Sequence, residues 1–242
     1  MKTMYLKIGV FVFITLIVTA VLAVLQQKIN LDFEKITLPQ LAPLIGFLAV
    51  VLIFKDLIFT VNFNFNRAIG IKTLIACIIP FLLFSISFFI GKLAGINVKI
   101  TENLPSILPI MIIGILIGAV GEEIGWRGFL QPILEKKHSI FIASIIVGTV
   151  WGLWHIGHYK NGLFFMIGFL LFTISASIII AWLLRETQFN IIIAIVFHIA
   201  INLGFVVFFK NSLTDFKLMI INGIVWLIPA IALIFKELQC LK

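Results

Sequence analysis

The sequence predicts an all-α membrane protein, a polytopic bundle of about eight transmembrane helices. Its 242 residues are 62% hydrophobic and only 12% charged, whereas a soluble domain carries roughly a quarter charged residues. The apolar residues also fall into runs of about 20, the length that a helix needs to cross a bilayer. So few charges could not cover a water-facing surface, and lipid must therefore surround most of the side chains.

The apolar runs are separated by short polar breaks. The first run follows Lys2 and Lys7, and we interpret it as a span because it is longer than the apolar core of a signal peptide and no A-x-A cleavage site follows it. Lys55 and Asp56 interrupt the second run, and the count falls to seven without it. The predicted spans are residues 8–26, 41–60, 72–91, 107–134, 139–157, 163–184, 189–209 and 217–235.

The polar breaks are too short to hold a soluble domain, so residues 1–242 are predicted to form a single membrane domain. Such a chain is an integral, multi-pass protein, located in the plasma membrane if the source is bacterial. The net charge is +8, and most of the Lys and Arg residues stand at the ends of apolar runs. This pattern is typical of loops beside anionic lipid headgroups, so the bilayer, and not nucleic acid, is the expected partner.

The second half of the chain differs from the first in carrying ionisable residues inside its apolar runs. Before residue 104 the polar residues stand mostly at the ends of runs. A charge within a bilayer span costs a few kcal/mol, so such residues mark function by default. They are Glu122, Glu123, Arg127, His155 and His198.

Some of these residues also have a purely structural interpretation. Glu123 and Arg127 are four residues apart and can pair on one helix face. Glu122 then points about 100° away from Glu123 and remains an unpaired carboxylate. An unpaired carboxylate in lipid is energetically costly. Considered alone, His155 is more typical of a hydrogen-bonded core histidine than of a catalytic one.

Spacing along the chain favours one shared site. Glu122 and His155 are 33 residues apart, with a polar turn midway between them. An antiparallel hairpin would place both at one depth, roughly 25 Å from that turn. From the next turn, His198 is roughly 15 Å away and Asn202 roughly 21 Å away. Hydrogen bonds between helices would explain that pair alone, but unrelated polar residues would not need to share one half of the membrane.

Three motifs within residues 104–205 resemble the signature of a known family. They read Glu-Glu-x-x-x-Arg, aromatic-x-x-x-His and His-x-x-x-Asn on successive predicted helices. The residues are Glu122, Glu123 and Arg127, then Trp151 and His155, then His198 and Asn202. In this order they resemble type II CAAX prenyl endopeptidases and their bacterial relatives, the CAAX-protease and bacteriocin-processing family, which includes bacteriocin-immunity proteins. The family usually has Phe where this chain has Trp.

The resemblance implies an intramembrane peptidase that hydrolyses a peptide bond. By this likeness Glu122 is the base, and His155 works beside it on the attacking water. His198 and Asn202 would stabilise the oxyanion, commonly the largest catalytic term. The supporting positions of the family are matched by Glu123 and Arg127. The implied partner is a peptide or membrane-protein substrate, with or without a lipid.

No cofactor is expected, although the family is often described as metal-dependent. A zinc site could use Glu122, His155 and His198, a known type of ligand set. Helical rise, however, places His198 about two turns deeper than Glu122, which is awkward for a zinc–ligand bond of about 2 Å. Asn202 is a poor zinc ligand but a good hydrogen-bond donor. A metal-free site therefore uses all four residues, and we favour it.

Two other functions fit the same composition. A proton-coupled transporter could use buried Glu, His and Arg as a relay. Transporters often show internal repeats with broken helices in both halves, while here the buried charges lie in one half only. A non-catalytic immunity or scaffold protein could keep the motifs as structure, but such a protein would have no need of Glu122.

Overall fold

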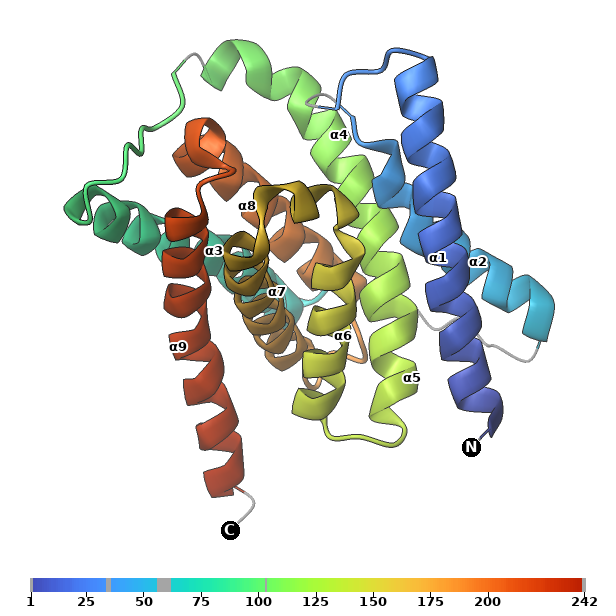
Figure 1. Ribbon diagram of the computed structural model, residues 1–242. Coiled ribbons are helices and arrows are strands. Elements are labelled where there is room, and N and C mark those ends of the chain that lie inside the picture. Colours follow the sequence, from blue (N-terminus) through green and yellow to red (C-terminus); the bar gives the residue numbers. More distant parts are fainter. Residues whose placement is uncertain (1, 34–35, 56–61, 103, 241–242) are drawn as a thin grey trace.

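The computed structural model describes residues 2–33, 36–55, 62–102 and 104–240, most of which are helical (Figure 1). The all-α prediction is confirmed, since these ranges contain nine α-helices and no β-strand, only an isolated bridge between Asn62 and Asn190. The helices are α1 (Lys2–Lys28), α2 (Ala42–Phe54), α3 (Arg67–Leu93), α4 (Leu104–Gly125), α5 (Gln131–Glu135), α6 (Ile140–Trp154), α7 (Leu163–Leu184), α8 (Ile191–Phe209) and α9 (Phe216–Cys240).

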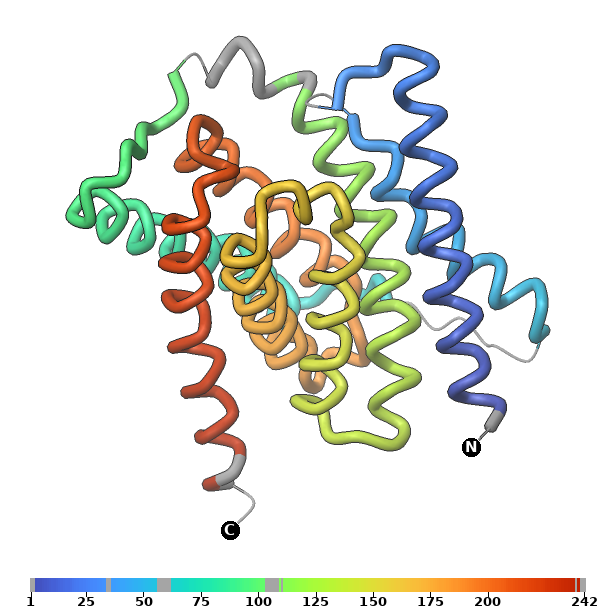
Figure 2. The backbone as a smooth tube through the Cα atoms, in the orientation of Figure 1, coloured from blue at the N-terminus to red at the C-terminus, as the bar shows by residue number. Residues whose placement is uncertain are grey.

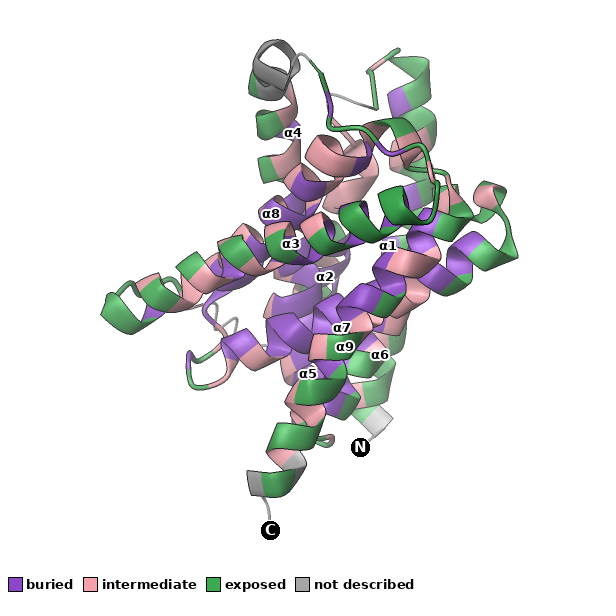
Figure 3. Cartoon of the chain, turned by 90° about the vertical axis from the view of Figure 1, so that its left-hand side faces the viewer, coloured by how far each residue is buried: buried purple, intermediate pink, exposed green. Residues whose placement is uncertain are grey.

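The outer surface of the bundle is apolar. In the described ranges five helices, α1, α3, α7, α8 and α9, are long and apolar enough to cross a membrane, and α2 and α6 are shorter apolar helices. Large apolar side chains such as Phe13 and Leu52 are 65% and 74% exposed, and exposed positions follow the outer faces of the helices (Figure 3). Lipid tails are as apolar as these side chains. The protein is an integral, multi-pass membrane protein.

The second predicted span is shorter than expected. Helix α2 ends at Phe54, and Lys55 adopts a left-handed backbone conformation with a φ of 49°, which an α-helix cannot continue. Part of the predicted range 41–60 falls in residues 56–61, which lie outside the described ranges. Lys55, the interruption visible in the sequence, therefore marks the end of the helix.

Two spans in the motif region also differ from the prediction. The predicted span 139–157 ends as an α-helix at Trp154 and continues as the 3₁₀ segment Ile156–Asn161. The predicted span 107–134 is one helical run, but a π-helical segment, Trp126–Leu130, joins α4 to α5. Single π-turns inside α-helices occur frequently at functional sites, and this one begins three residues after Glu123 and includes Arg127.

The motif helices lie inside the bundle. Helix α4 packs against α2 and α8, while α7 packs against α6 and α9 (Figures 1 and 2). Aromatic side chains fill the space among α3, α7, α8 and α9: the Phe84 ring lies 4.7 Å from the Phe205 ring and 5.1 Å from the Trp226 ring. This core fixes α8, which carries His198, relative to the other helices.

Glycines on α4 allow the 3₁₀ turn Leu38–Leu41 to approach closely. A Cβ atom added at Gly118 would lie 2.3 Å from Gln40 Oε1, and one added at Gly121 would lie 2.8 Å from Gln40 O. Small residues at helix interfaces permit such backbone approach in membranes. The turn that precedes α2 therefore rests directly on the motif helix α4.

We expect Gly148→Ala to destabilise the fold by about 1–3 kcal/mol, because an added methyl group would overlap the neighbouring helix. Its Cβ would lie 2.6 Å from the Cα atom of Ile174 on α7. Gly9→Ala in α1 is the matched control, since nothing lies within 4 Å of the added atom; it should be neutral or slightly stabilising. Thermal unfolding in detergent measures both variants. Equal melting temperatures would contradict the tight contact between α6 and α7.

Candidate active site

The helical run from α4 to α5 buries three charged residues. Glu122 and Glu123 are completely buried, and Arg127 is 1% exposed. The Nη1 atom of Arg127 lies 3.0 Å from Oε1 of Glu123, which confirms the predicted ion pair. Successive helical residues point about 100° apart, so Glu122 faces a different set of neighbours.

Both carboxylate oxygens of Glu122 accept hydrogen bonds from neutral donors. Gln40 Nε2, from the turn before α2, donates to Oε1 at 2.9 Å. Trp151 Nε1, on α6, donates to Oε2 at 2.7 Å. A buried carboxylate is costly unless it is hydrogen-bonded. Three segments far apart in the sequence therefore meet at this one group.

His198 on α8 bridges the two glutamates. Its Nδ1 atom lies 2.7 Å from Oε1 of Glu123, and its Nε2 atom lies 4.0 Å from Oε1 of Glu122. An ionised carboxylate only accepts hydrogen bonds, so Nδ1 carries a proton. Glu123 thereby fixes the ring with its other nitrogen directed towards Glu122.

Trp151 contacts three of the site residues. Besides its bond to Glu122, its ring lies 4.7 Å below the guanidinium carbon of Arg127, a cation–π geometry. The ring of His198 lies 5.4 Å away on a tilted plane. The aromatic position of the second motif is therefore part of the site and not only core packing.

His155 lies at the end of α6 and is half-buried. Its Nδ1 atom is 2.8 Å from the carbonyl oxygen of Trp151. A carbonyl accepts only, so Nδ1 donates and Nε2 keeps its lone pair in the neutral ring. The ring stacks on that of His158 with centroids 5.6 Å apart. Burial, assisted by the charge of Lys160, lowers the pKa of His158 to about 4, so the stacked partner is neutral at neutral pH.

The arrangement differs from the expected one at His155. We expected Glu122 and His155 to face each other, but Trp151, one turn earlier on α6, occupies that position. The α-helix ends directly before His155, so its side chain leaves the helical path. In the described part of the chain, no hydrogen bond or ion pair joins the two residues.

Asn202 lies one turn after His198 on α8 and is half-buried. It makes no hydrogen bond with any residue in the described ranges, so its amide is open to another partner. The structure thus brings together Glu122, Glu123, Arg127, Trp151 and His198.

The side chains do not form the zinc-ligand set considered from the sequence. Among the described residues, no group of three His, Cys, Asp or Glu side chains is arranged to hold a metal ion. A catalytic zinc takes three protein ligands, so the described side chains do not supply a site for one.

Gln40 is the site residue that sequence reasoning missed. It is neutral, it lies 82 residues before Glu122, and it belongs to no motif. Its signal was indirect: Gly118 and Gly121 are three residues apart and share the helix face on which Gln40 packs. Small residues at this spacing indicate a close helix contact without identifying the partner.

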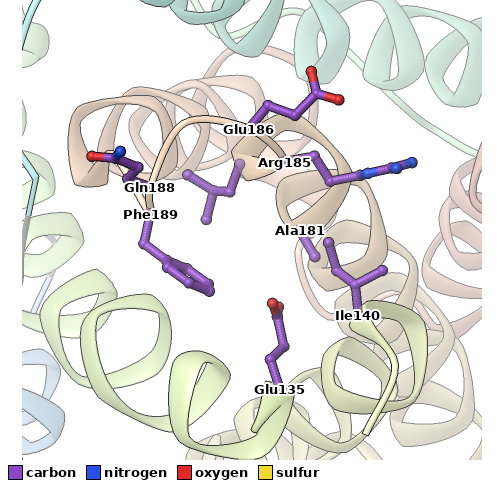
Figure 4. Close-up of a pocket in the computed structure, with 8 residues that line it drawn as sticks. Glu135, Ile140, Ala181, Arg185, Glu186, Gln188 and Phe189 are labelled. Carbon is purple, nitrogen blue, oxygen red and sulfur yellow. The ribbon is translucent and has the colours of Figure 1, made fainter.

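A separate cavity of about 290 Å³ lies at the turns that join α5 to α6 and α7 to α8 (Figure 4). Its polar residues are Glu135, Arg185, Glu186 and Gln188. Gln131 Nε2 donates to Glu135 Oε1 at 2.6 Å, and burial raises the pKa of Glu135. None of the predicted site residues lines this cavity, so it is distinct from the cluster around Glu122.

The motif region matches a known protein family. Residues 104–204 match the family described as Rce1-like, type II CAAX prenyl endopeptidase Rce1-like. This region of the chain is similar to that family. The resemblance of residues 104–205 to CAAX-type proteases is confirmed, and at the level of the family it supports an intramembrane peptidase.

Individual relatives carry two different names. The chain is 29% identical over 243 residues to lysostaphin resistance protein A of Staphylococcus haemolyticus, covering 95% of this chain and 67% of the relative. It is 29% identical over 134 residues to CAAX prenyl protease 2 of Methanococcus maripaludis, covering 51% of this chain and 48% of the relative. For lysostaphin resistance protein A of Staphylococcus aureus strain MRSA252, identity is 28%, with 87% and 51% covered. The chain thus spans about half to two thirds of these relatives.

We expect Arg127→Ala to reduce the amount and thermal stability of the folded protein, by about 3–5 kcal/mol. The reason is that it leaves the Glu123 charge buried without its ion-pair partner. Adding Glu123→Gln to Arg127→Ala removes that charge but keeps an oxygen that can accept from His198, so the double variant should be the more stable of the two. Expression level and thermal unfolding in detergent provide the comparison. A double variant less stable than Arg127→Ala would contradict the ion-pair explanation.

Proposed function

We propose that the chain is an intramembrane endopeptidase that hydrolyses a peptide bond with a water molecule activated by Glu122. The observation that carries this proposal is the Glu122 carboxylate. It is completely buried, both its oxygens are held by neutral donors, and the Nε2 atom of His198 lies 4.0 Å from it. A buried carboxylate with no cation within hydrogen-bond distance can still take a proton from water.

The proposed reaction begins when Glu122 accepts a proton from water as the oxygen attacks the peptide carbonyl. The free Nε2 atom of His155 supplies a second acceptor for this water. The carbonyl oxygen gains the negative charge in the tetrahedral intermediate. When the carbon–nitrogen bond breaks, the proton on Glu122 passes to the departing amine, and the carboxylate is regenerated.

His198 and Asn202 are proposed to stabilise the oxyanion. Glu123 holds the His198 ring at Nδ1, and Nε2, directed into the site, donates to the oxyanion in the imidazolium form of the ring, which carries a proton on each nitrogen. The Asn202 amide has no partner in the described ranges and lies on the same face of α8, one turn away. Two donors that are free in the resting site and engaged by the intermediate favour the transition state over the substrate.

The substrate is proposed to be a peptide or membrane protein that reaches the site from the bilayer. The relative from Methanococcus maripaludis is named a CAAX prenyl protease, which makes a prenylated peptide one reasonable probe. The longer match, to a protein named for lysostaphin resistance, supports testing unlipidated membrane peptides as well.

We expect Glu122→Gln to lower the cleavage rate by about a thousandfold or more, because the amide cannot take a proton from water. The purified protein in lipid nanodiscs would be incubated with farnesylated CAAX peptides and unlipidated membrane peptides, and products identified by mass spectrometry. Glu135→Gln, the same change at a half-buried carboxyl outside the site, is the control and should keep normal activity. Cleavage that survives Glu122→Gln would refute the mechanism. A non-catalytic immunity or scaffold role predicts no cleavage by any variant.

We expect a chelator to leave peptide cleavage unchanged, because the side chains are not arranged as a zinc-ligand set. Elemental analysis of the purified protein should find metal well below one ion per chain. Activity would be measured before and after chelation, and again after zinc is added back. Loss on chelation followed by recovery with zinc alone would overturn the metal-free mechanism while leaving Glu122 essential.

A further inference from the structure

The 3₁₀ turn before α2 is shaped to deliver the Gln40 amide to Glu122. The glycines at 118 and 121 remove the side chains that would otherwise collide with the amide and backbone of Gln40, at 2.3 Å and 2.8 Å respectively. Across this gap Gln40 Nε2 reaches Oε1 of Glu122 at 2.9 Å. Gln40 lies outside residues 104–204, the range that matches the family.

Trp151 supplies the opposite donor. Its indole Nε1 donates to Oε2 of Glu122 at 2.7 Å, a bond that the Phe more usual at this motif position could not make. Trp151 is 2% exposed, and its ring contacts both Arg127 and His198. Its N–H is therefore held in a fixed direction. Gln40 and Trp151 thus donate to the two oxygens of the Glu122 carboxylate from different structural elements.

We propose that Gln40 and Trp151 form a pair of positioning residues that hold the Glu122 carboxylate in its reactive orientation. This role rests on the proposed function of Glu122 as the base. Neither residue is proposed to contact the attacking water or the peptide. Both act through Glu122, Gln40 from the N-terminal region and Trp151 from the second motif.

The neutrality of the donors is what suits them to this role. A Lys or Arg partner would bind the carboxylate tightly and oppose its protonation by water, as Arg127 does for Glu123. An amide and an indole N–H orient the group and offset the loss of hydration without cancelling its charge. The charged or titratable groups around Glu122 are Glu123 and Arg127 on its own helical run and His198 on α8. The turn before α2 contributes no ionisable side chain.

The first test removes each donor and keeps its volume. We expect Gln40→Met and Trp151→Phe each to lower kcat about tenfold with KM nearly unchanged, and the double variant to lose more than either. Gln40→Glu keeps the shape of the residue but replaces the donor by an acceptor, so it should be worse than Gln40→Met. A merely space-filling role predicts the reverse order. Trp226→Phe is the control, because its buried Nε1 has no hydrogen-bond partner in the described ranges.

The second test needs no substrate and so separates this inference from the proposed function. With ¹³C-labelled glutamate, the infrared difference between the wild type and Glu122→Gln isolates the Glu122 bands. These should be carboxylate bands, displaced in Gln40→Met and Trp151→Phe and unchanged in Trp226→Phe. Unaltered bands in folded Gln40 and Trp151 variants would overturn the inference, even if cleavage is observed. Displaced bands in a protein that cuts no peptide would support the positioning role of Gln40 and Trp151 and would contradict the proposed peptidase function.

Discussion

Two adjacent carboxylates buried in a membrane domain are the constraint on which this structure depends. Glu122 and Glu123 are removed from bulk water, and an ionised carboxylate left unpaired in such surroundings is prohibitively costly. Three other segments supply polar partners for these carboxylates. Helix α6, helix α8 and the 3₁₀ turn that precedes α2 each place a polar side chain against this one turn of α4. Much of the helix arrangement can be understood as the packing that makes these contacts simultaneous.

The two carboxylates are satisfied in different ways, and this asymmetry separates their roles. Glu123 forms an ion pair with Arg127 and accepts a hydrogen bond from the ring N–H of His198, so its charge stabilises the fold. Glu122 has two neutral donors and only an indirect approach to His198, so its charge remains available to a proton. Helical geometry makes the division natural, because residues one position apart point into different surroundings. A Glu-Glu pair can therefore hold a structural carboxylate and a reactive one side by side.

The sequence predicted the fold class, most helices and the Glu123–Arg127 pair, because these depend on local composition and i,i+4 spacing. The relative depth of the site residues in the membrane was less predictable. Helical rise placed His198 about two turns from Glu122, yet their side chains are 4.0 Å apart, because the calculation treats helices as parallel rods whereas those of the bundle cross at an angle (Figure 1). His155 was assigned to a helix face that ends one residue earlier. Gln40 carries no charge or motif, so only a close tertiary contact reveals it.

The N-terminal helices are more than a membrane anchor for the motif region. The Phe11 ring of α1 lies 5.5 Å from that of Trp126 and 5.0 Å from that of Phe129, both in the π-helical segment that follows the Glu-Glu motif. Trp154, at the end of α6, donates to Thr19 of α1 at 2.6 Å. Helix α1 thus contacts the π-helical segment after α4 and the end of α6, while the turn after it carries Gln40. Without this unit Glu122 would keep one donor instead of two, so the site is complete only when sequence from both halves of the chain is packed together.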